Sequence, residues 1–163
     1  MQSRLRLRRQ AVPDDADGSE MRGRYLSDTP LAFPSMKHRA VIADIAQADE
    51  EAGAMVTITL DMGGIEHRGA AVGSVDMRDR PRIIGEAALR AVESMSGGTL
   101  NLELMAIATA GIGDSQVAVA QVRLNPFEEI LVGSAMLNDD DDPSWAAARA
   151  VMDALNRRLS ALL

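Results

Sequence analysis

Residues 72–92 read VGSVDMRDRPRIIGEAALRAV, and residues 132–151 read VGSAMLNDDDDPSWAAARAV. Both stretches begin with Val-Gly-Ser and end with Arg-Ala-Val. At an offset of 60 residues the first tripeptides align and Gly53 meets Gly113; after one deletion the offset is 59 and the second tripeptides align. Self-similarity at a nearly fixed spacing is typical of a repeated structural unit. The sequence therefore predicts two copies of one unit.

Each copy is predicted to contain three strands. Leucines at 100, 102 and 104 alternate with Asn101 and Glu103, which is the period-two pattern of a half-buried strand. Asp44 falls on the phase that Leu104 occupies, so the first strand of copy one is either shifted by one residue or contains a bulge. The predicted strands cover residues 40–48, 55–62 and 65–73, and then 100–108, 117–124 and 129–134.

Turns and helices complete each copy. Gly63-Gly64 predicts a tight hairpin, because a two-residue primed turn needs positive φ. Pro81 lies near the start of a helix that Gly97-Gly98 ends, and Asp142 with Pro143 begins a second one. Apolar residues recur at helical spacing in both helices. They are Ile84, Ala87, Ala88, Ala91, Val92 and Met95, then Ala148, Val151, Met152, Leu155, Leu159 and Leu162.

These elements predict an α+β fold, a tandem βββα repeat with a pseudo-two-fold relation. Repeat one covers residues 39–98 and repeat two covers 99–163, after a flexible leader at 1–38 that lacks an apolar period. Alternating Arg and Leu at residues 4–9 leave a short strand or a nucleic-acid-contacting arm as other interpretations of that leader. Each three-stranded sheet needs cover, so we expect the repeats to pack together and a homodimer to form.

The amino-acid composition limits the classes of function that the chain can have. The chain has no cysteine, which excludes disulfides and thiolate chemistry, and only four aromatic residues, which disfavours base stacking. Residues 1–39 contain eight Lys and Arg against five Asp and Glu, so the remaining residues contain nine against nineteen and are net negative. An acidic body repels phosphate backbones. No apolar stretch is long enough to span a bilayer or act as a signal peptide, so we expect a cytoplasmic protein.

No catalytic or metal-binding arrangement is predicted. His38 and His67 lack a nucleophile in a recognisable motif, and Gly-Ser at 73–74 and 133–134 lacks the Gly-x-Ser-x-Gly pattern. The carboxylates of Asp139–Asp142 diverge and lack the glycine of a calcium loop, so favourable charge at a helix N-terminus explains them better. These aspartates also stand where a double-stranded-RNA-binding domain needs lysines. We expect no enzyme, cofactor or metal.

The sequence resembles the C-terminal regulatory, or dimerisation, domain of alpha-isopropylmalate synthase and its relatives. Val72-Gly73-Ser74-Val75-Asp76 stands where that family has Gly-x-Gly-Pro-Val-Asp, with Ser74 replacing the proline. Residues 148–157, ARAVMDALNR, track the family's last helix. The resemblance covers about residues 39–160 and implies a pair of βββα units. The catalytic barrel, which takes about 250 residues, does not fit in 163.

The resemblance implies a non-catalytic regulatory module that binds an amino acid such as leucine, or a related small acid. It places the ligand at six residues: Gly73, Ser74, Val75, Asp76, Gly133 and Ser134. Glycine lets backbone amides approach a carboxylate, and a helix N-terminus adds partial positive charge. The alternative interpretation is that these glycines only permit a tight strand exit. For the whole chain, the alternative function is a ligand-free oligomerisation or scaffolding module.

Overall fold

The computed structural model describes residues 39–51, 53–125, 127–137 and 142–162. The predicted leader, with His38, and Asp139–Asp141 lie outside these residues. Within them the elements are β1 (Val41–Glu50), β2 (Gly53–Met62), β3 (Ile65–Gly73), α1 (Arg80–Met95), β4 (Asn101–Ile112), β5 (Ser115–Asn125), β6 (Glu129–Leu137) and α2 (Pro143–Leu162).

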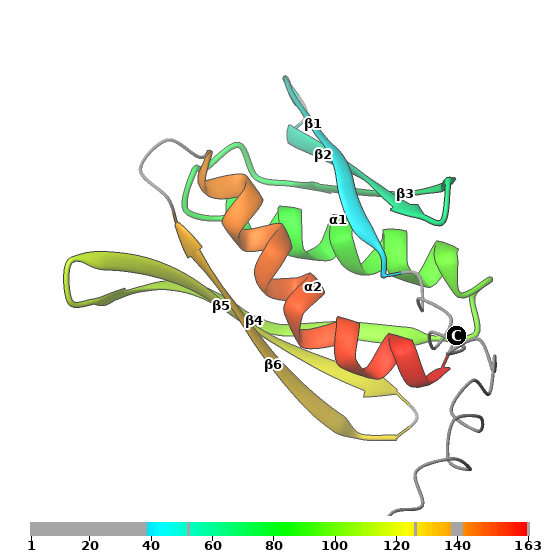
Figure 1. The fold of residues 1–163 in the computed structure, drawn as a ribbon. Helices are drawn as coiled ribbons and strands as arrows, with labels where there is room; N and C mark the ends of the chain where they lie inside the picture. Colours follow the sequence, from blue (N-terminus) through cyan, green and yellow to red (C-terminus); the bar gives the residue numbers. More distant parts are fainter. Residues whose placement is uncertain (1–38, 52, 126, 138–141, 163) are drawn as a thin grey trace, which may run out of the picture. The chain divides into compact units, whose positions relative to one another are not determined.

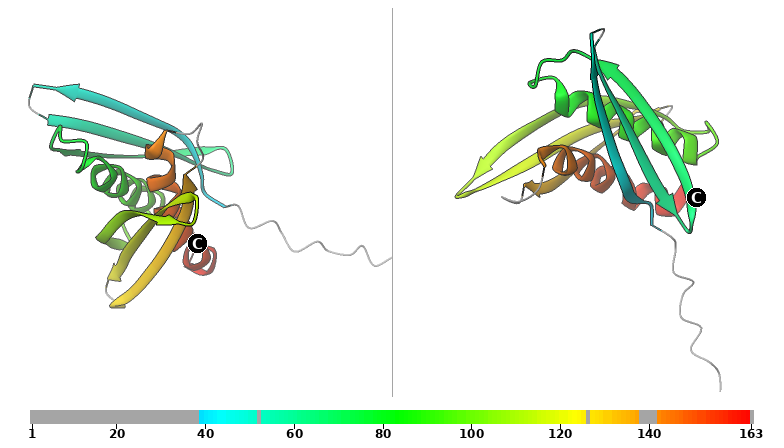
Figure 2. Two further views of the ribbon diagram at one scale, coloured as in Figure 1. Left: turned by 90° about the vertical axis from the view of Figure 1, so that its left-hand side faces the viewer. Right: turned by 90° about the horizontal axis from the view of Figure 1, so that it is seen from above.

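The strands form two antiparallel sheets in the orders β1-β2-β3 and β4-β5-β6, and one helix follows each sheet. The predicted α+β tandem βββα fold is therefore confirmed. The two helices lie side by side between the two sheets, as both Figure 1 and Figure 2 show. None of the described helices is long and apolar enough to cross a membrane.

Glycine and aspartate residues form the turns and helix ends, as the local sequence predicts. Gly63 and Gly64 have φ of 67° and 87°, the conformation that closes the β2–β3 hairpin. Gly97 and Gly98 also have positive φ and follow the last turn of α1. Asp142 caps α2, since its Oδ1 accepts a hydrogen bond of 2.9 Å from the backbone N–H of Ser144.

The first strand of each repeat contains a bulge. In β1 the register shifts between Ile42 and Asp44, and in β4 it shifts between Leu104 and Ala106. The bulge considered for β1 from the sequence is thus present, and it occurs in both copies. The extra residue of the bulge changes the direction in which the following side chains point, so Ile45 and Ile107 both pack against the core.

One core serves both repeats. The buried apolar residues of α1, α2, β2 and β5 form a single cluster, in which Ile58, Ile84, Val122 and Leu155 are almost fully buried. The helices contact each other, and β4 packs on α1 where Leu104 and Ile107 approach Gly85. α2 in turn contacts β1. Each repeat therefore helps to cover the helix of the other.

The spacing of the repeats differs from the predicted 60 and 59 residues. Ile58 pairs with Gly69, and Ala120 pairs with Gly133, so the copies are displaced by 62 residues in β2 and by 64 in β3. A Cβ on Gly69 would meet the backbone of Ala87 and Ala91, and a Cβ on Gly133 would meet that of Ala150 and Ala154. The helices are therefore displaced by 63. The structural equivalent of Gly133 is Gly69, and the aligned Val-Gly-Ser and Arg-Ala-Val tripeptides are not equivalent.

Candidate functional site

The predicted segment at 73–76 organises the entry to α1. Gly73 ends β3, and a Cβ there would come 2.7 Å from Cδ1 of Ile83, so glycine makes room for the helix. Ser74 Oγ accepts a hydrogen bond of 3.0 Å from the backbone N–H of Asp76, whose Oδ1 accepts one of 2.9 Å from the N–H of Arg78. Val75 is exposed. Local turn contacts thus already occupy both polar side chains.

The second predicted segment lies in the other sheet. Gly133 is in the middle of β6, where it crosses α2 closely, and the backbone N–H of Ser134 donates to Oδ2 of Asp153 at 3.0 Å. The two segments lie in sheets on opposite sides of the helices (Figure 1). None of the six predicted residues lines the cavity described next.

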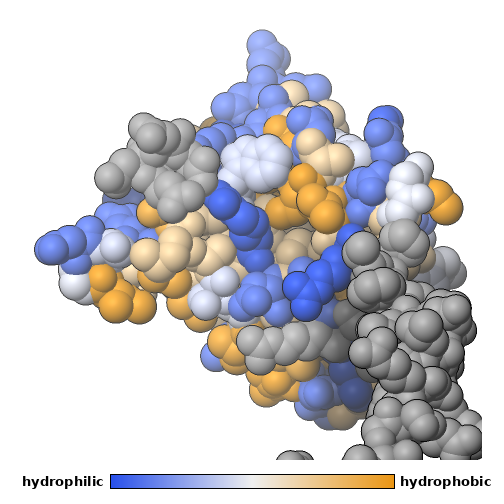
Figure 3. Space-filling model, viewed as in Figure 1, coloured by the Kyte–Doolittle hydropathy of each residue, from blue (hydrophilic) through white to orange (hydrophobic). Residues whose placement is uncertain are grey.

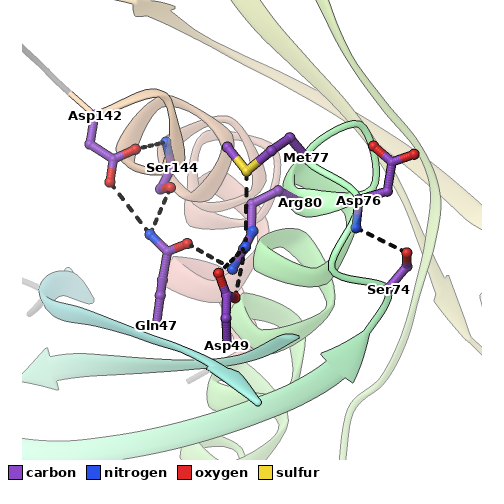
Figure 4. Close-up of polar contacts among 8 residues, drawn as sticks. All are labelled: Gln47, Asp49, Ser74, Asp76, Met77, Arg80, Asp142 and Ser144. Carbon is purple, nitrogen blue, oxygen red and sulfur yellow. Dashed lines mark hydrogen bonds and ion pairs between the residues drawn. The ribbon is translucent and has the colours of Figure 1, made fainter. Parts of the chain in front are cut away.

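A cavity of about 350 Å³ lies where the N-terminal ends of α1 and α2 meet the C-terminal end of β1. Its lining combines polar and apolar side chains, and Figure 4 draws the polar ones together with Met77. The polar residues are Gln47, Asp49, Arg80, Asp142 and Ser144, and the apolar ones are Met77, Pro81, Ile84 and Pro143. Residues from both repeats therefore build this cavity.

Arg80 is the buried cation of the cavity. Its side chain is 8% exposed, and its Nη2 lies 2.8 Å from Oδ1 of Asp49. Nη1 donates to Oε1 of Gln47 at 3.4 Å, and Nη2 lies 3.9 Å from Sδ of Met77. Nε is buried and has no hydrogen-bond partner. A guanidinium has five N–H donors, so protein acceptors do not satisfy this one completely.

Gln47 connects the two repeats. Its Nε2 donates to Oγ of Ser144 at 2.9 Å and lies 3.4 Å from Oδ2 of Asp142, while its Oε1 accepts from Arg80. β1 thereby joins the first turn of α1 to the first turn of α2. Gln47 is thus bonded both to Arg80 in repeat one and to the first turn of α2 in repeat two.

The arrangement suits a small zwitterion with an apolar side chain. One guanidinium and two helix N-termini favour a carboxylate, whereas Asp49 and Asp142 favour an ammonium group. Ile84 and the two prolines offer an apolar wall. The cavity volume lies at the lower end of the range for small-molecule sites.

Other chemistry has less support in the described ranges. No group of three His, Asp or Glu side chains there is placed to hold a metal ion. His67 is half-buried on β3, opposite Leu60.

No protein-family model matches the chain, and no curated protein matches it. The resemblance to the regulatory domain of alpha-isopropylmalate synthase therefore stays a prediction.

The sequence contains a pattern that indicates this cavity, and the pattern lies outside the repeated tripeptides. Arg80 stands four residues before Ile84 and seven before Ala87, so a cation occupies the first position of the apolar stripe of α1. Gln47 and Asp49 continue the inward phase of Ile45. Polar residues at inward positions of two elements are the pattern that indicates a site between them.

Proposed function

We propose that this domain is a non-catalytic regulatory module that binds an amino acid, or a related small carboxylic acid, in the cavity between its repeats. The observation that carries the proposal is Arg80, a buried and incompletely hydrogen-bonded guanidinium that lines a cavity. A buried charge is costly unless it is paired, and a ligand carboxylate is a stronger acceptor for this guanidinium than the neutral amide of Gln47. The resemblance to a regulatory domain supports the same function.

Binding in this cavity has a route to a regulatory effect. A carboxylate on Arg80 competes with Asp49 and Gln47 for the same N–H groups. Gln47 is also bonded to Ser144 at the start of α2, so its displacement loosens the contact between β1 and the second repeat. The ligand thus favours an arrangement of the repeats in which the contact between Gln47 and Ser144 is broken, because it makes better contacts in that arrangement.

The test is a thermal-shift titration of the full chain with amino acids and their 2-oxo acids. A ligand of the native state raises the melting temperature with a saturable dependence. Trp145, the single tryptophan, follows Ser144 directly and gives a second readout by fluorescence. Gln47→Glu adds a carboxylate beside Arg80 on an exposed position and should weaken binding, whereas Arg68→Gln, at an exposed ion pair with Glu66, should not. A flat response across the panel contradicts the proposal.

The alternative function, a ligand-free oligomerisation module, has its own support. Large apolar side chains are exposed on the strands, among them Val72, Ile130, Val132 and Met136. Large contiguous patches of exposed apolar side chains mark interaction surfaces. A dimer that persists at low concentration, together with no response to any ligand, favours this alternative.

A further inference from the structure

The sheet of β4, β5 and β6 carries apolar residues on both faces. Its inner face packs on the helices through alternate residues of β5, from Ala118 to Leu124. Its outer face contains eight apolar residues, and Gln121, Arg123 and Ser134 lie on the same face. The apolar residues are Val117 and Val119 on β5, Ala106, Ala108 and Ala110 on β4, and Ile130, Val132 and Met136 on β6. An antiparallel sheet that faces water on one side normally alternates apolar with polar residues. We call the sheet β4-β5-β6 sheet B, and its eight outward apolar residues the outer face of sheet B.

Large side chains on this outer face are exposed to solvent in the single chain. Ile130, Val132 and Met136 are 56%, 60% and 50% exposed. Orange apolar side chains gather along the lower margin of the molecule in Figure 3, where β4, β5 and β6 lie in Figure 1. The register places Ala110, Val117 and Met136 side by side in one row across the three strands, whereas Gln121 lies between Ala106 and Val132.

The outer face of sheet B differs in net charge from the outer face of the sheet β1-β2-β3. The strands β1 to β3 present Asp44 and Asp61 outward together with the Glu66–Arg68 ion pair, so these four residues sum to −2. On sheet B, Glu103 lies at one end and its carboxylate is 3.1 Å from Nη1 of Arg123, so the pair is neutral. The chain as a whole has a net charge of −7. Two copies therefore repel each other least where sheet B faces sheet B.

Side-chain size varies across the outer face of sheet B in a self-complementary way. Ala106 and Val132 lie on either side of Gln121, and Ala110 and Met136 lie on either side of Val117. The side chains on β4 are therefore short, and those on β6 project further from the sheet. A two-fold axis parallel to the strands places the β6 side of one copy over the β4 side of the other. Such an isologous contact repeats each pairing twice.

We propose that the outer face of sheet B is the contact surface between two copies of this chain, with Val132 of one copy over Ala106 of the other and Met136 over Ala110. The partner is thus a second copy, and the dimer contains two packed sheets, which lie about 10 Å apart in proteins. This surface is separate from the cavity of the proposed ligand site and does not depend on it. It specifies the surface that the oligomerisation alternative leaves open.

The test is sedimentation equilibrium of the full chain and of variants at exposed positions. The wild type should have twice the mass of the chain. Val132→Glu and Ala106→Lys should each give monomers, because each dimer would bury two like charges. An equimolar mixture of these two variants should regain the dimer, because the introduced glutamate of one copy then faces the introduced lysine of the other and the second contact is wild type. The matched control Val72→Glu, at a 67% exposed valine on the other sheet, should stay dimeric.

Several outcomes overturn the proposal. A monomeric wild type at high concentration leaves the outer face of sheet B to a different protein. A dimer that survives in Val132→Glu, or dissociates in Val72→Glu, places the interface elsewhere and leaves the oligomerisation alternative intact. Circular dichroism confirms that each variant is folded, and the ligand titration on Val132→Glu separates the two sites. Its ligand response should equal that of the wild type whichever result the mass gives.

Discussion

Nη2 of Arg80 lies 2.8 Å from Oδ1 of Asp49, and the two side chains differ sharply in exposure, 8% against 60%. The cation is buried at the start of α1, whereas the anion reaches it from the solvent-exposed end of β1. A buried charge is costly unless it is paired. The exposed partner therefore matters more to this pair than exposure alone suggests.

Asp49→Ala should lower the free energy of unfolding by more than Glu66→Ala. Loss of Asp49 leaves the Arg80 guanidinium buried without its closest acceptor, which costs about 1–2 kcal/mol. Glu66 pairs with Arg68 at 3.0 Å in an exposed setting, where such a pair contributes about 0–1 kcal/mol. Urea denaturation of both variants measures the difference. Equal midpoints would show that the Arg80 pair is no more important than a surface pair.

Asp49→Asn should change ligand preference in favour of 2-oxo acids over the matching amino acids. The carboxylate of Asp49 competes with a ligand carboxylate for Arg80, but it also attracts a ligand ammonium group. Asparagine keeps the shape and removes both effects. Because Asp49 is largely exposed, we expect a change in the ratio of the two affinities of about threefold to fivefold. Calorimetric titrations measure both constants, and an unchanged ratio contradicts this role of Asp49.

Asp142→Ala should destabilise α2 more than Asp79→Ala destabilises α1. The Asp142 carboxylate accepts the backbone N–H of Ser144, and loss of such a cap costs about 1 kcal/mol. Asp79 occupies the N-cap position of α1 without a side-chain hydrogen bond, so its loss should cost no more than about 0.5 kcal/mol of favourable helix-end charge. Asp142→Asn should restore most of the stability, because asparagine is also a good cap. Thermal unfolding of the three variants measures this order.

The sequence predicted the elements well and the alignment of the repeats poorly, for physical reasons. Alternation and turn glycines are local, so Leu102, Leu104 and Gly63-Gly64 indicated strands and a hairpin correctly. The Val-Gly-Ser matches misled, because Gly73 ends a strand to make room for Ile83 whereas Gly133 lies against the backbone of α2. Identical tripeptides can serve different contacts. The cavity was missed because its residues come from β1 and two helix starts, which only the tertiary fold brings together.

Repeat equivalence rests instead on two close crossings of strand over helix. Gly69 and Gly133 are both buried, each opposite an inward residue of the central strand. A methyl group at Gly69 would fall on backbone atoms of Ala87 and Ala91, and a methyl group at Gly133 on those of Ala150 and Ala154. Backbone cannot rotate away as a side chain can, so the strand and the helix would have to separate.

Gly69→Ala and Gly133→Ala should therefore each lower the free energy of unfolding by about 1–3 kcal/mol, the cost of overpacking a core. Gly111→Ala is the matched control, because no atom lies within 4 Å of the place its Cβ would take. There the substitution should be neutral or slightly stabilising, since alanine lowers the entropy of the unfolded chain. Urea midpoints for the three variants measure the difference. If Gly133→Ala is tolerated while Gly69→Ala is not, the two crossings are not equivalent and the spacing of the repeats must be assigned differently.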